Sequence, residues 1–102
     1  MKIELKHLQM ETVHKVIRLS RKKTSRESGA ELEAYLRSLP GSEMGELMAL
    51  TWFGRDPIDR SKEFPQMVRQ AMGDLKGAVP YLAAKRLADH LTRALEKAEE
   101  DD

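Results

Sequence analysis

The segment from Glu46 to Arg55 constrains the fold more than any other part of the chain. It reads ELMALTWFGR, and at about 100° per residue of an α-helix its apolar side chains fall on nearly every side. A helix that is apolar all round must be enclosed by neighbouring segments or by a second chain. We therefore predict a central helix at about 42–54, with other helices packed around it.

The composition is typical of one small domain. The chain has 102 residues and no cysteine, so it is long enough to bury a core and cannot form disulfides or a thiolate zinc site. The longest nearly apolar run, 47–53, is far shorter than the roughly 20 residues that cross a bilayer. Residues 1–6 alternate apolar and charged side chains, unlike a secretory signal. We expect residues 1–102 to form a single helical domain of a cytoplasmic protein without membrane contact.

Charge is distributed unevenly along the chain. Residues 1–26 contain eight Lys or Arg against two Glu, a net charge of +6, and the remainder contains ten basic against fifteen acidic residues, a net charge of −5. Five of those acids lie in the last seven positions. Because terminal runs of like charge are usually solvated, we interpret residues 96–102 as a frayed acidic helix end.

Apolar residues recur at helical spacing on both sides of the central helix. The other predicted helices cover about 10–23, 30–39, 61–72 and 78–98, the second of them after a loop at 24–29. We interpret Gly54 as a left-handed cap that ends the central helix. The predicted fold is all-α, a compact bundle of about five helices around the central one.

The chain also resembles a known family. The matching residues are E-L-x-A-L-x-W-x-G-R at 46–55 followed by Asp56, the pairs Leu39-Pro40 and Tyr81-Leu82, and LADHL at 87–91. They resemble a family of small bacterial all-helical proteins catalogued only as a domain of unknown function. The resemblance covers most of the chain after the first helix and implies a compact helical fold, but no activity, cofactor or catalytic residue. Similar proteins often have a proline just after the Tyr-Leu pair; this chain lacks it, so we expect an unbroken last helix.

Apolar side chains on two helices are candidates for contact with another chain. Trp52 and Phe53 point to opposite sides of the central helix, and we place Trp52 in the core and Phe53 nearer the surface. Leu50 and Phe53 belong to the second apolar side of this helix, and Leu91 and Leu95 to the apolar stripe of the last helix. We expect self-association, or binding of an unknown protein partner, through these four leucine and phenylalanine side chains.

Basic side chains form the other candidate site. The outer side of the first helix carries Lys15, Arg18, Arg21 and Lys22, which together could neutralise phosphates. This helix offers no aromatic side chain to stack on bases and few amides to read base edges, so nucleic acid is an alternative partner that we do not favour. Arg55 is a candidate for anion binding through its planar fork; a competing interpretation has it binding the free carbonyls that end the central helix.

No residue pattern indicates catalysis or a cofactor. His7 and His14 are two helical turns apart, roughly 10 Å, which is too far to chelate one metal ion. Asp89 and His90 are adjacent on a helix, so their side chains diverge by about 100°. A glycine-rich phosphate loop and a nucleophile elbow are both absent from the sequence. We predict a protein-interaction or structural module without catalytic activity, with nucleic-acid binding by the first helix as the alternative.

Overall fold

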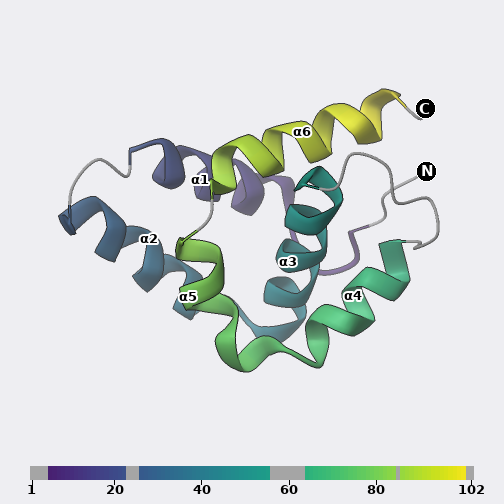
Figure 1. Cartoon of the computed structure of the whole chain (residues 1–102), viewed down its shortest axis with the longest axis horizontal. Coiled ribbons are helices and arrows are strands. Elements are labelled where there is room, and N and C mark those ends of the chain that lie inside the picture. The colour runs from purple at the N-terminus through teal and green to yellow at the C-terminus, as the bar shows by residue number, and fades with distance from the viewer. Residues whose placement is uncertain (1–4, 23–25, 56–63, 85, 101–102) are drawn as a thin grey trace.

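The computed structural model describes residues 5–22, 26–55, 64–84 and 86–100, which are mostly helical (Figure 1). These residues form six α-helices and one 3-10 helix, and no strand occurs among them. The elements are α1 (Met10–Arg21), α2 (Arg26–Ser38), α3 (Gly41–Arg55), α4 (Phe64–Met72), η1 (Leu75–Gly77), α5 (Ala78–Ala83) and α6 (Leu87–Glu100). The predicted all-α fold is confirmed.

Helix α3 lies at the centre of the bundle (Figure 1) and packs mainly against α6 and α4. Its buried residues lie on all sides of the helix: Met44, Gly45, Glu46, Leu47, Met48, Ala49, Leu50, Thr51, Phe53 and Gly54. Full burial of a leucine side chain contributes roughly 1.5–3 kcal/mol, so α3 is a main source of stability. The prediction of an enclosed central helix is confirmed.

A buried glutamate ties the segment before α1 to α3. Glu46 is 3% exposed, and its carboxylate accepts hydrogen bonds from the backbone N–H groups of Lys6 (3.2 Å), His7 (3.0 Å) and Leu8 (2.9 Å). Leu8 is also buried. Three amide donors compensate for the removal of a carboxylate from water. Glu46 therefore fastens the N-terminal segment, a role that the sequence did not suggest.

The predicted unbroken helix at 78–98 is wrong, because the chain forms α5 and α6 with a break between them. Ala78 and Leu82 are fully buried, and so are Leu87 and Leu91. In one continuous helix the first pair would point about 180° away from the second. A straight helix could not bury both pairs on one core. The break lets α5 pack against α2 while α6 packs against α3 and α1.

Gly54 is not the left-handed cap that we predicted. Helix α3 continues to Arg55, and none of the described glycines has a positive φ. The role of Gly54 is close packing, because a Cβ atom at this position would overlap the backbone carbonyl oxygen of His90 in α6. Only glycine allows two helix backbones to approach this closely.

Other predicted boundaries need smaller corrections. Helix α2 begins at Arg26, inside the segment 24–29 that we predicted to be a loop. The predicted helix start at Ser61 lies outside the described residues. Helix α6 continues to Glu100, so the acidic tail is helical up to that residue, and residues 101–102 are outside the description. Within the described ranges, no helix has the length and apolar character to cross a membrane.

Candidate functional site

A cleft of about 380 Å³ opens beside α3, between α4 and α5. Eight of the described residues line it: Met48, Trp52, Arg55, Met67, Gln70, Asp74, Gly77 and Tyr81. Figure 1 shows α4 and α5 diverging on either side of α3 from the short connection between them. Side chains from three helices and their connection therefore border one hollow.

The cleft has an apolar floor and an ordered polar wall. Met48 and Met67 are almost fully buried and form the floor. Trp52 and Tyr81 are half-buried and form the wall. The Tyr81 hydroxyl accepts hydrogen bonds from the indole Nε1 of Trp52 (3.2 Å) and from Nη1 of Arg55 (2.9 Å). These bonds hold the indole, phenol and guanidinium groups in fixed relative positions.

Opposite charges border the cleft at its two ends. Arg55 is the last residue of α3. Asp74 directly precedes Leu75, whose side chain packs beside Gly41 at the start of α3. The rim is thus positive towards the C-terminal end of α3 and negative towards its N-terminal end. The exposed amide of Gln70 on α4 adds a neutral polar group.

The prediction that Trp52 lies in the core and Phe53 nearer the surface is wrong. Phe53 is 9% exposed and belongs to the core, whereas Trp52 is only partly buried, at the cleft. The indole N–H is a donor that needs an acceptor when it leaves water, and the Tyr81 hydroxyl supplies it. A phenyl ring has no such requirement, which is why Phe53 is suited to the drier side of α3.

Three of the four residues that we expected on an apolar contact surface are buried within the single chain. Leu50 and Leu91 are fully buried and Phe53 nearly so, while Leu95 is partly buried against the core. The expected exposure of the second apolar side of α3 is wrong because α6 covers it. Lys97 of α6 donates to the Phe53 carbonyl oxygen (2.9 Å), and its ammonium lies 5.4 Å from the centroid of the Phe53 ring. Self-association stays a prediction, without the surface that we assigned to it.

The predicted basic residues of the first helix are exposed on the outer side of α1. They are Lys15, Arg18, Arg21 and Lys22. The Lys15 ammonium lies 4.5 Å from the centroid of the Tyr35 ring, and an Nη2 group of Arg21 donates to Thr92 Oγ1 over 3.4 Å. The structure does not bring Arg55 into this group, because Arg55 lies at the cleft.

The histidines and acidic side chains do not converge on a metal site in the described part of the chain. No group of three or more His, Cys, Asp or Glu residues there is arranged to hold an ion. The backbone N–H of His7 binds Glu46, and His14 is exposed on α1.

The amino-acid sequence matches the model of one known protein family. A family described as a protein of unknown function, DUF3775, matches residues 29–99. The chain belongs to the DUF3775 family. The match includes the whole cleft of this DUF3775 member, from Met48 to Tyr81, and confirms the resemblance to a domain of unknown function. No significant match was found among curated proteins or solved structures.

Sequence reasoning missed most of the cleft. It placed none of Met67, Gln70, Asp74 and Tyr81 in a binding site. One signal was available: positions 48, 52 and 55 share a side of α3, because residues four and seven apart align on a helix. The residues from α4, α5 and their connection reach the cleft only through the tertiary arrangement, which helical periodicity does not encode.

Proposed function

We propose that this DUF3775 member is a protein-interaction module that binds a partner segment in the cleft beside α3. The observation that carries the proposal is the half-buried Trp52, held by Tyr81 next to Arg55. Trp, Tyr and Arg are the residues most enriched among those that dominate binding energy at protein interfaces. Their clustering around one hollow supports a binding role.

The apolar floor supports the same role. Unbranched methionine side chains fill irregular spaces and adapt to different partners, which suits Met48 and Met67 to contact with an apolar side chain. Elsewhere among the described residues, only Met10 and Met72 are large hydrophobic side chains with high exposure, at 45% and 42%. Within the cleft, the partly exposed rings of Trp52 and Tyr81 supply the apolar surface that a partner could cover.

The charges on the rim define the chemistry of the partner. An acidic residue would be stabilised near Arg55 and a basic residue near Asp74. A cleft of about 380 Å³ lies at the small end of the usual range for binding pockets, so it suits one or two side chains. The occupant is a protein segment with an apolar side chain between an acid and a base, running alongside α3.

The proposed role requires no chemical step. The described lining residues include one carboxylate, Asp74, and no serine, threonine or histidine. Paired acids and bases, the usual basis of hydrolytic chemistry, are absent from this lining. The alternative function, nucleic-acid binding, depends on a different face of the molecule, the exposed side of α1.

Photo-crosslinking tests the proposal. A benzoylphenylalanine at position 70, on the rim, is introduced into the full chain in its native host, and the crosslinked peptides are identified by mass spectrometry. We expect one main partner, crosslinked at a segment where an apolar residue lies between an acid and a base. Titration of the matching synthetic peptide should show binding at least tenfold weaker for Arg55→Glu.

The control carries the same crosslinker at position 34, an exposed site on α2. Circular dichroism melting of Arg55→Glu shows whether the variant is folded. The same adducts at positions 34 and 70 would overturn the proposal, as would a peptide whose affinity for folded Arg55→Glu is unchanged.

A further inference from the structure

We propose that the outer side of α1 binds the phosphate backbone of nucleic acid without sequence preference. The surface consists of Lys15, Arg18, Arg21 and Lys22, and is called the α1 basic stripe. All four side chains are exposed, and none of them lines the cleft. This inference is independent of the proposed partner site.

The stripe is compact, and contacts with neighbouring residues hold two of its side chains in place. From Lys15 to Lys22 the helix rises about 10 Å, at 1.5 Å per residue. Arg18 and Lys22 are one turn apart on the same side of α1. At the edges, Lys15 lies over the Tyr35 ring and Arg21 donates to Thr92, which limits the conformational freedom that binding would remove.

Neighbouring acids leave the positive charge concentrated on α1. Glu11, in the first turn, is the single acidic residue of α1. Over residues 86–96, exposed Arg86, which directly precedes α6, and exposed Arg93 are balanced by exposed Asp89 and Glu96. These positions therefore neither add to the stripe nor cancel it, and the remaining acids of α6, Glu99 and Glu100, come at the C-terminal end of the helix.

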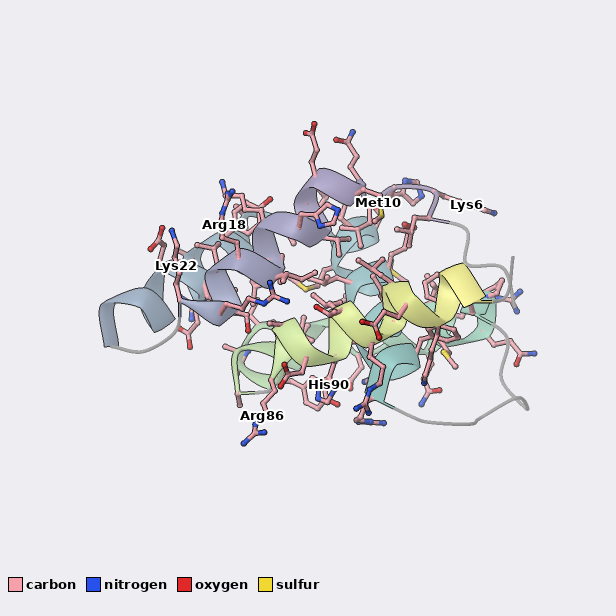
Figure 2. All side chains as sticks on the ribbon, turned by 90° about the horizontal axis from the view of Figure 1, so that it is seen from above. Lys6, Met10, Arg18, Lys22, Arg86 and His90 are labelled. Carbon is pink, nitrogen blue, oxygen red and sulfur yellow. The ribbon has the colours of Figure 1, made fainter. Side chains whose placement is uncertain are left out.

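The stripe lies at an accessible end of the molecule. Figure 2 shows Arg18 and Lys22 extending outward along the second half of α1, while Arg86 extends from the start of α6 at the opposite edge of the view. Arg37 of α2, outside the stripe, is paired with Glu33 (3.6 Å). Lys22 has a further interaction of its own, so binding would depend on the combined charge of the whole stripe.

The spacing of the stripe fits a phosphate backbone. One strand carries a negative charge about every 3.4 Å of helix axis, so about three phosphates of each strand span the stripe. The outer side of α1 carries no Phe, Tyr, Trp or amide side chain, and its one ring is that of His14, so binding would not depend on base sequence. Its one exposed large apolar side chain is Met10, at the far end, which is too little for insertion into a membrane surface.

The salt dependence of binding follows from the number of phosphates contacted. Three to four contacts give a slope of about −3 in a plot of log K against log salt. The dissociation constant should therefore rise roughly 40- to 150-fold between 50 and 200 mM salt.

Fluorescence anisotropy with a labelled 20-base-pair DNA duplex and a matching RNA duplex, each over a range of salt concentrations, tests the proposal. One variant removes three charges from the stripe: Arg18→Gln, Arg21→Gln and Lys22→Gln. The control removes three exposed charges elsewhere: Arg37→Gln, Arg69→Gln and Lys76→Gln. Both triple variants have the same net charge, and their thermal melting is measured alongside.

We expect binding of both duplexes with the slope given above. The stripe variant should bind at least tenfold more weakly, with a slope shallower by two or more, and the control less than threefold more weakly. Absence of binding at 20 mM salt, or equal losses in the two triple variants, would overturn the proposal. Equal competition by polyglutamate at matched charge would also overturn it, because the surface would then select acidic protein as readily as nucleic acid.

Discussion

Removing the Glu46 carboxylate should cost the domain about 3 kcal/mol of unfolding free energy. The N–H of Leu8 makes a buried bond to this carboxylate, and a buried donor without an acceptor costs about 1–3 kcal/mol. The N–H groups of Lys6 and His7 are only partly buried, so they can regain water and add about 0.5–1 kcal/mol each. For Glu46→Ala the loss lies between about 2 and 5 kcal/mol.

Urea denaturation followed by Trp52 fluorescence measures this loss. With a slope of about 1–3 kcal/mol per molar urea for a domain of this size, the midpoint should fall by roughly 1–3 M. Glu46→Gln should lose less than Glu46→Ala, because its carbonyl oxygen can still accept from Leu8 and His7 while its amide nitrogen faces the N–H of Lys6. The control is Glu43→Ala, a less buried acid one turn earlier on α3, with an expected cost below about 1 kcal/mol.

Hydrogen exchange adds a local readout for the same variants. The amides of Lys6, His7 and Leu8 should lose protection in Glu46→Ala while the amides of α6 keep theirs at low denaturant. Equal midpoints for Glu46→Ala and Glu43→Ala would refute the reasoning, because the three hydrogen bonds would then contribute nothing measurable.

Two further predictions concern close packing and the cleft. Gly54→Ala should destabilise the fold by about 3 kcal/mol, measured by thermal denaturation, because the new Cβ would overlap the His90 carbonyl oxygen. This is the opposite of the usual gain when alanine replaces a helical glycine. The control is Gly77→Ala, which has open space around the new Cβ and should change the stability by less than about 0.5 kcal/mol. Tyr81→Phe removes the acceptor of the Trp52 indole N–H and should lower the unfolding free energy by about 1–2 kcal/mol. The Trp52 emission spectrum should also change. An unchanged spectrum would contradict the hydrogen bond between Trp52 and Tyr81 in the wall of the cleft.

The central helix could be predicted because its composition leaves few alternatives. A segment in which Leu47, Met48 and Phe53 face different directions must be covered on several sides. The exposed side of α1 could be predicted equally well, because charged residues such as Arg18 recur opposite Val13 and Val16. Both predictions depend only on periodicity within one helix.

The sequence contains a signal for the break between α5 and α6, although we predicted one continuous helix at 78–98. The apolar pairs Ala78/Leu82 and Leu87/Leu91 are about 180° out of phase, and this shift, without a proline after Leu82, is the signal of the break. The environments of Trp52 and Phe53 were not encoded locally, because they depend on Lys97 and Tyr81, which come from later helices.

The cleft was the least predictable feature. Met48, Trp52 and Arg55 share one side of α3, but the same spacing would equally suit a buried face. What makes this side a cleft is the divergence of α4 and α5 around it (Figure 1). This divergence follows from the packing of α4 on α3 and of α5 on α2, which is tertiary information.

The central claim is that α3 is enclosed by helices of its own chain. Native-state hydrogen exchange across a hundredfold range of protein concentration tests it most directly. The amides from Leu47 to Phe53 should be among the slowest to exchange, should open only with global unfolding, and should show the same protection at every concentration. Fast exchange of these amides, or protection that falls on dilution, would mean that a second chain covers α3 and would contradict the account.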